Sequence, residues 1–340
     1  MDERDAIFGL LRSALNDGKA ELPRQIDWHR LFTLLQQNHV AALASKAFDH
    51  MAQEQKPPRS VLIPWLSERE KAAVRYRHQL DVQHEIEALM HQHGIETLTL
   101  KGTRLAQHYP LPELREFSDL DLYFYHRHDE ADALAEKHLG VTVSNDAHHH
   151  SKYDYRSVTI ESHFDLVNAH YPPSNRRYEA LLKTEAPSPT FEVLFLLRHM
   201  AGHFAASRIT LRDLVDWHLL STAHRTAADW NKVQNGIKES GMADFAEALN
   251  TIAHNRFGTD NPLPHNADSS LVERIENDII YGNLAEHKEE TLRRLVWKLR
   301  RYRTNRWKHR LVYQHDPAWR LFLASLTAHA AKPRSILHKM

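Results

Sequence analysis

The chain has 340 residues, in which 44 lysine and arginine residues balance 44 aspartate and glutamate residues. With 26% charged and 42% hydrophobic residues, this is the composition of a folded globular protein, and its charge gives no sign of a polyanionic partner. It contains no cysteine, which excludes disulfides, thiolate metal sites and cysteine nucleophiles.

The N-terminal segment lacks the features of an export signal. Its first residues are acidic rather than basic, and its apolar residues are spaced at helical intervals instead of forming a block. No uncharged apolar run approaches the roughly 18 residues needed to cross a bilayer. We therefore expect a cytoplasmic protein.

Residues 1–95 are predicted to form a helical region. Apolar residues recur at helical spacing, as in Ile7, Leu10, Leu11 and Leu15, and a proline-containing linker at 53–60 interrupts the pattern. With only 10 glycines in the chain, a turn-rich architecture of many strands is not expected.

Residues 96–170 have the pattern of a small α/β core. ETLTLKG, at 96–102, suits a buried strand followed by a turn, and a short helix and a proline-rich loop follow it. DLDLYFY, at 119–125, alternates strictly between polar and apolar residues, which predicts a strand with an acidic end. A helix closed by Gly140, a short strand at 141–144 and a hairpin at 152–167 complete the core.

Residues 171–340 return to helical periodicity from about residue 178. A long amphipathic helix rich in arginine and lysine is predicted at 290–313, and a further helix at 318–331. The expected fold class is therefore α+β and predominantly helical, with a small mixed sheet between two helical regions.

The acidic strand is the best candidate for a metal site. Asp119 and Asp121, two residues apart on a strand, point to the same side and can share a divalent cation. Mg²⁺ prefers oxygen ligands and is usually held by one or two carboxylates plus substrate phosphates. The second arm of the hairpin carries acids on one face, so Glu161 is the candidate third ligand and Asp165 is its rival.

These segments, in this order, resemble a known family. LTLKG at 98–102, Arg115 followed by DLDL at 119–122, and IESHFDL at 160–166 are similar to segments of nucleotidyltransferases of the DNA polymerase β superfamily, in an uncharacterised bacterial group. Flanking helical segments extend the resemblance over roughly residues 26–220. The chain departs from the better-characterised members at the turn, where Lys-Gly-Thr replaces their Gly-Ser or Gly-Gly.

The resemblance implies a nucleotidyltransferase fold that binds a nucleoside triphosphate and Mg²⁺ or Mn²⁺. It implies that Asp119, Asp121 and Glu161 are the catalytic metal ligands. The residues that it places against the triphosphate are Lys101, Gly102, Thr103 and Arg115. The reaction implied is transfer of a nucleoside monophosphate to an acceptor with release of pyrophosphate, and the acceptor is not named by the sequence.

Several other patterns have simpler interpretations. His199 and His203 have the i, i+4 spacing of a zinc pair, to which Asp213 or Asp216 could add a carboxylate, but chance pairs are common among 27 histidines. Arg212 and Asp216 are predicted to form an ion pair along one helix. The histidines at 148–150 are predicted to lie in a solvated loop.

The basic C-terminal segment is the remaining candidate for a partner site. It could contact RNA, anionic lipid or a phosphorylated substrate, or it could be a solvated helix face. Its basic residues are Arg293, Arg294, Lys298, Arg300, Arg301, Arg303, Arg306, Lys308 and Arg310. The alternative to an enzyme is a non-catalytic relative of the same fold that binds a nucleotide, RNA or a protein.

Overall fold

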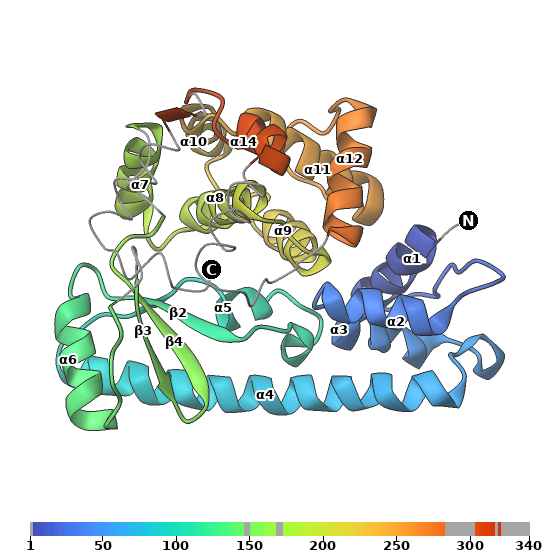
Figure 1. The fold of residues 1–340 in the computed structure, drawn as a ribbon, viewed down its shortest axis with the longest axis horizontal. Coiled ribbons are helices and arrows are strands. Elements are labelled where there is room, and N and C mark those ends of the chain that lie inside the picture. The colour runs from blue at the N-terminus through green and yellow to red at the C-terminus, as the bar shows by residue number, and fades with distance from the viewer. Residues whose placement is uncertain (1–2, 146–149, 168–172, 283–302, 317–318, 321–340) are drawn as a thin grey trace.

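A computed structural model describes residues 3–145, 150–167, 173–282, 303–316 and 319–320. Within these residues the chain forms a four-stranded mixed sheet with helices packed on both sides (Figure 1). The predicted α+β, predominantly helical class is confirmed.

One long helix dominates the N-terminal region. The elements before the sheet are α1 (Glu3–Asn16), α2 (Trp28–Gln37), α3 (Ala41–Ser45), the 3-10 turns η1 (Lys46–His50) and η2 (Gln53–Gln55), and α4 (Arg59–Gln92). The prolines of the linker immediately precede α4, and Pro58 occupies its N-cap position. In Figure 1, α4 runs along the whole lower edge of the molecule, beneath both the sheet and the N-terminal helices.

The sheet has the strand order β1-β2-β4-β3. Its strands are β1 (Leu98–Thr99), β2 (Asp119–Tyr123), β3 (His150–Tyr155) and β4 (Val158–His163). The central pair, β2 and β4, is parallel, and the two outer pairs are antiparallel. Between β1 and β2 lie α5 (Thr103–Ala106) and η3 (Pro112–Leu114), and α6 (His128–Leu139) follows β2.

Local sequence explains the turns of this core. Gly140 ends α6 in the left-handed conformation that glycine adopts most readily, as predicted. Arg156 and Ser157 both have positive φ angles, of 49° and 64°, which is the geometry of the tight turns that join antiparallel strands.

Two details of the prediction are wrong. Residues 141–144 do not form a strand, because only Ser144 pairs with the sheet, through an isolated bridge to Lys152. His150 does not lie in a loop, because it pairs with His163 at the first position of β3. The other two histidines of that run, at 148 and 149, lie outside the described residues.

The C-terminal helices form a layer over the open face of the sheet. They are α7 (Pro173–Glu185), α8 (Pro189–Ala206), α9 (Leu211–Ala223), α10 (Trp230–Ser240), α11 (Ala243–Phe257), α12 (Ser269–Tyr281) and α14 (Arg306–Val312). Ser188 caps α8 by accepting a hydrogen bond from the backbone N–H of Phe191. At the start of α9, Asp213 accepts hydrogen bonds from the backbone N–H and hydroxyl of Thr210. These caps fix where the two helices nearest the sheet begin.

Most of the predicted basic helix at 290–313, and nearly all of the helix predicted at 318–331, lies outside the described residues. In the described part, α14 begins at Arg306. Lys308 is buried there and donates hydrogen bonds to Asp278 and to the backbone carbonyl of Ser207. This lysine is therefore a packing residue, and contact of the basic segment with RNA stays a prediction.

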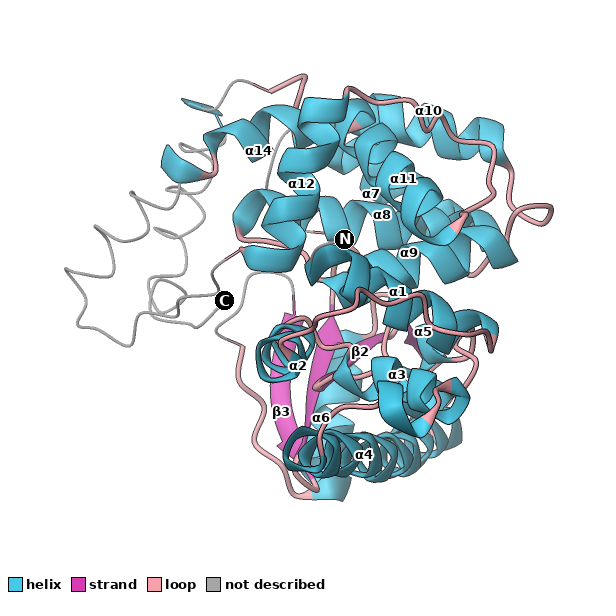
Figure 2. Ribbon diagram, turned by 90° about the vertical axis from the view of Figure 1, so that its right-hand side faces the viewer, coloured by secondary structure: helices cyan, strands magenta, loops and turns pink. Residues whose placement is uncertain are grey.

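The N-terminal and C-terminal helices share one hydrophobic core. The ring of Phe8 on α1 lies 5.6 Å from that of Phe257 on α11, edge to face, and both residues are buried in the same cluster. A second, smaller cluster joins α4, α6 and the sheet. Figure 2 shows the resulting layers, with α8, α9, α11 and α12 above the sheet and α4 below it. The boundaries at 96–170 for a separate core stay a prediction.

Among the described helices, none combines the length and the apolar character that a bilayer span requires.

Candidate active site

Three carboxylates converge at the centre of the sheet. Asp119 and Asp121 lie on the same side of β2, and the parallel register places Glu161 of β4 directly beside Asp121. One carboxylate oxygen from each residue lies within 4.8 Å of the others. The structure thus brings together the three acids predicted from the sequence.

The rival acid lies elsewhere. Asp165 follows the end of β4, and its carboxylate lies 3.7 Å from the ammonium of Lys183 on α7. It belongs to none of the groups of potential metal ligands among the described residues. Glu161 is therefore the third acid of this arrangement.

Lys101 enters the site from the turn after β1. Its Nζ donates to Oδ1 of Asp121 at 2.9 Å and to Nε2 of His199 on α8 at 3.2 Å. Burial opposes the charge on this lysine, but the negative charges of Asp121 and Asp119 outweigh it and raise the pKa of Lys101. The turn thus delivers a fixed positive charge to the carboxylates.

Asp121, which is buried, and Glu161, which is partly buried, have opposite pKa shifts. Burial opposes ionisation of Asp121, but the charge of Lys101 and the hydrogen bond donated by Nε2 of His163, at 3.0 Å, hold its pKa well below the ordinary value. Burial and the neighbouring charges of Asp121 and Asp119 raise the pKa of Glu161. Asp121 is therefore held ionised, and a divalent cation at the cluster would favour the ionised form of Glu161 as well.

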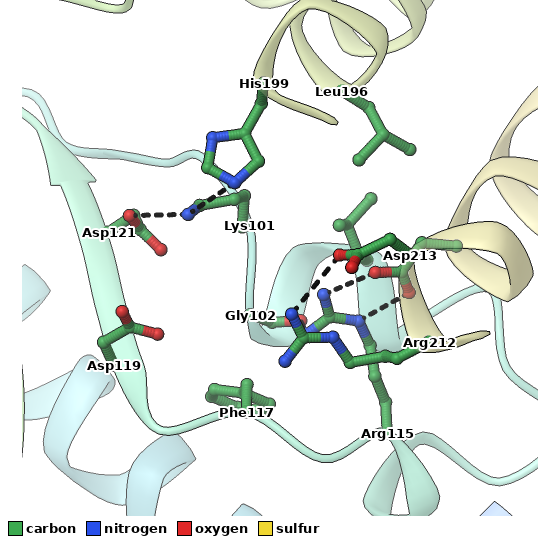
Figure 3. A pocket seen from close by; sticks show the side chains of 12 residues that line it. Lys101, Gly102, Arg115, Phe117, Asp119, Asp121, Leu196, His199, Arg212 and Asp213 are labelled. Carbon is green, nitrogen blue, oxygen red and sulfur yellow. Dashed lines mark hydrogen bonds and ion pairs between the residues drawn. The ribbon is translucent and has the colours of Figure 1, made fainter. Parts of the chain in front are cut away.

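A hollow of about 330 Å³, including space open to solvent, lies beside the carboxylates between the sheet and helices α8 and α9. Figure 3 shows Asp119 and Asp121 on one side of it and Arg212 and Arg115 on the other, with Lys101 and Gly102 between. Apolar side chains contribute part of the wall. They are Leu105, Phe117 and Leu196. The hollow is polar toward the acids and is not filled by apolar packing.

The turn after Lys101 depends on glycine. Gly102 has a φ of +58°, and a Cβ at this position would lie 3.2 Å from the ring of Phe117. Thr103 comes next, but it does not line the hollow, and its buried hydroxyl donates to Gln83 on α4. A phosphate contact from Thr103 would therefore have to come from its backbone N–H.

Arg115 is engaged in a buried ion pair. Its Nε and Nη2 donate to the two carboxylate oxygens of Asp216 on α9, at 2.8 and 2.7 Å, and Nη1 donates to the carbonyl of Gly102 at 3.2 Å. Tyr109 donates to the same carboxylate at 2.7 Å. Arg115 thus links the Gly102 turn to α9. Its contact with phosphate stays a prediction.

The predicted ion pair along α9 is wrong. Asp216 is bound by Arg115, from a different part of the chain, rather than by Arg212 on its own helix. Arg212 instead contacts the adjacent Asp213 at 3.3 Å and extends into the hollow. The helical spacing gave no sign of this, because the competing partner lies 101 residues away in the chain.

His150 is a site residue that the sequence interpretation missed. Its Nε2 lies 3.7 Å from Glu161, and it forms a second group of potential ligands with Glu161 and His163. The sequence feature that could have shown this is the alternation in HSKYDY, which places His150 and Lys152 on one face of β3. Across the antiparallel pair, His150 lies opposite His163 and Lys152 lies opposite Glu161.

The zinc interpretation of α8 finds no geometric support. The rings of His199 and His203 lie 4.3 Å apart, but no convergent group of three potential ligands among the described residues includes either one. Asp216 and Asp213, the proposed carboxylates, are engaged by Arg115 and by Thr210. The third convergent group, His108, Glu192 and His224, lies away from the hollow.

A family model described as an uncharacterised nucleotidyltransferase matches residues 24–258, which include every residue of this site. The chain belongs to this uncharacterised nucleotidyltransferase family. Comparison with curated proteins and with solved structures gives no significant match. The family match confirms the resemblance drawn from LTLKG, DLDL and IESHFDL, and it covers the three acids together with α8 and α9.

Proposed function

We propose that this protein is a metal-dependent nucleotidyltransferase that moves a nucleoside monophosphate from a nucleoside triphosphate to an acceptor and releases pyrophosphate. The observation that carries the proposal is the convergence of Asp119, Asp121 and Glu161 beside a polar hollow. Membership of the nucleotidyltransferase family supports the reaction class.

The donor set fits magnesium or manganese. All three side chains offer carboxylate oxygens, which hard divalent cations prefer, and Asp119 and Glu161 are only partly buried. Asp119, Asp121 and Glu161 would hold the ion or ion pair. Such ions, when bound, neutralise the phosphates and stabilise the charge that develops on the attacking and leaving oxygens.

The other residues of the site would position the substrate and the carboxylates and neutralise phosphate charge. Lys101 is paired with Asp121 and lines the hollow, so its ammonium would be available to a phosphate oxygen if Asp121 held a divalent cation instead. His163 holds the carboxylate of Asp121 in place through its ring N–H. Gly102 lines the hollow in a left-handed conformation that suits glycine, and its backbone would be open to a close approach by the phosphates. Most of the catalytic effect expected from such a site comes from alignment and charge stabilisation.

The test is a transfer assay with each α-labelled nucleoside triphosphate, Mg²⁺ or Mn²⁺, and cell extract as the source of acceptor. Wild type should transfer label and release pyrophosphate, whereas Asp121→Asn should lose at least about 100-fold in rate. Asp154→Asn is the matched control, since Asp154 is an exposed aspartate on β3 whose side chain accepts from Thr159. Equal rates for wild type and Asp121→Asn would refute the proposal.

A second candidate is a non-catalytic relative that only binds a nucleotide, RNA or a protein. The Lys-Gly-Thr turn favours it, because a lysine and a buried threonine replace the residues that hold the triphosphate in better-characterised relatives of this fold. The same assay separates the two. Tight binding of a triphosphate with Mn²⁺ but no label transfer with any triphosphate would favour the binding protein.

A further inference from the structure

The hollow contains three cationic side chains, and they differ in how fully they are already engaged. Lys101 is paired with Asp121, and Arg115 is fixed by two short hydrogen bonds to Asp216. The side chain of Arg115 is only 4% exposed. The Nε and Nη2 groups of Arg115, which donate these bonds, are therefore not available to a ligand.

Arg212 is engaged much less. Its guanidinium has five N–H groups, and the described residues accept from two of them. The carbonyl of Glu116 accepts at 3.2 Å and Oδ1 of Asp213 at 3.3 Å, both longer than typical charge-assisted bonds. Nε is buried and has no hydrogen-bond partner, while the side chain as a whole remains 25% exposed.

The position of Arg212 relative to the carboxylates suits a polyphosphate. In Figure 3 the aspartates of β2 stand on one side of the hollow, and Arg212 lies on the other, beside the Gly102 turn. A nucleotide whose α-phosphate is held at the carboxylates through a metal ion would extend its terminal phosphates across the hollow. Arginine suits that end because its planar fork binds two phosphate oxygens at once.

The acidic residues that line the hollow offset the positive charge that could attract a phosphate. The lining includes Lys101, Arg115 and Arg212 against Asp119, Asp121, Asp213 and Asp216, so acids outnumber cations. Asp213 is held at the start of α9 by Thr210 and orients the guanidinium of Arg212. An anion therefore needs a divalent cation at the carboxylates to offset this negative charge.

We propose that Arg212 forms a subsite for the terminal phosphates of the triphosphate, which become the pyrophosphate product. This inference rests on the proposed function. It adds that the terminal phosphates of the substrate point away from the carboxylates toward α9, and that Arg212 binds them. It requires the metal ion to bind before, or together with, the polyphosphate.

The test is calorimetric binding of inorganic pyrophosphate, and separately of AMP, to full-length protein with Mn²⁺. Arg212→Gln should weaken pyrophosphate binding by about 10- to 100-fold. It should leave AMP binding unchanged, because AMP has no terminal phosphates. Arg212→Lys should fall between, since it keeps the charge but loses the fork.

Arg225→Gln is the matched control, because Arg225 follows the opposite end of α9 and is exposed in an ion pair with Asp260. It should bind pyrophosphate as wild type does. Unchanged pyrophosphate binding in Arg212→Gln and Arg212→Lys, with Mn²⁺ binding intact, would overturn the subsite and leave the proposed function standing. Failure of wild type to bind either ligand with Mn²⁺, together with no effect of Asp121→Asn on metal binding, would overturn both.

Discussion

At the scale of single residues, the buried pair of Arg115 and Asp216 holds the site together. Each side chain is almost fully enclosed. Arg115 comes from the segment just before β2, and Asp216 comes from α9. Removing one charge from such a pair leaves the other buried and uncompensated, which typically costs about 3–5 kcal/mol. Asp216→Asn should therefore lower the free energy of unfolding by about 3 kcal/mol or more, measured by chemical denaturation.

The control for this prediction is Asp260→Asn, which removes the acid of the exposed pair with Arg225. Surface ion pairs contribute about 0–1 kcal/mol, so this variant should unfold almost as wild type does. Equal stabilities for Asp216→Asn and Asp260→Asn would show that the buried pair does not have the structural role assigned to it.

The pKa of Glu161 predicts how metal affinity depends on pH. Burial and the charges of Asp121 and Asp119 raise this pKa, so the carboxyl takes up a proton at a higher pH than an ordinary glutamate. Protons then compete with the metal, and affinity for Mn²⁺ should fall as the pH is lowered from 8 toward 5. The measurement is calorimetric titration with Mn²⁺ across this range.

Glu161→Gln removes the titrating group, so it should bind Mn²⁺ more weakly at pH 8 and show a flatter dependence on pH. Glu85→Gln serves as the control, because Glu85 is exposed on α4 and bonded to Tyr155 and Arg156, away from the carboxylates. A pH profile in Glu161→Gln as steep as that of wild type would contradict the role of Glu161 as a metal ligand.

At the scale of elements, the turn between β1 and α5 positions Lys101. Gly102→Ala would force a side chain into the left-handed region and against the Phe117 ring, at a cost of about 1–3 kcal/mol. We expect a loss of stability of this size and weaker nucleotide binding, measured by thermal unfolding and by calorimetry. Gly18→Ala is the control, since Gly18 has open space around its Cα. A Gly102→Ala variant as stable as Gly18→Ala would show that the turn tolerates a side chain.

Elements with a local signal could be predicted from the sequence. Alternation in DLDLYFY predicts β2, and the hairpin pattern at 152–167 predicts most of β3 and β4, because side chains on one face of a strand recur every second residue. The convergence of Asp119, Asp121 and Glu161 follows once these strands are adjacent. Residues 141–144 have an apolar alternation too, but they lie beside the sheet with a single bridge, since pairing depends on a partner strand.

Contacts between distant segments had no such signal. Asp216 pairs with Arg115, which lies 101 residues away in the chain and is brought beside it by the packing of α9. The i, i+4 spacing of Arg212 and Asp216 was therefore misleading. The part that α8 and α9 play in the hollow, through Leu196, His199 and Arg212, depends on how those helices dock on the sheet. Helical periodicity shows which face of a helix is buried but not what it is buried against.

At the scale of the whole molecule, the site lies between two layers. The sheet and α4 lie on one side and the C-terminal helices lie on the other (Figure 2). Asp119 and Asp121 of the sheet and Arg212 of α9 line the hollow. Because α1 packs against α11 in the main core, the N-terminal helices and the C-terminal layer are held together. The sheet therefore supplies the acids, while the helical layer supplies Arg212 and the partner of Arg115.

The proposed function depends on the binding of divalent cations by Asp119, Asp121 and Glu161. The most direct measurement is the anomalous diffraction of a crystal grown with Mn²⁺ and a slowly hydrolysed nucleoside triphosphate analogue. We expect manganese within about 2.0–2.3 Å of carboxylate oxygens of all three residues, with the terminal phosphates directed toward Arg212. Manganese found only at His108, Glu192 and His224, or no manganese at the three carboxylates despite bound nucleotide, would contradict it.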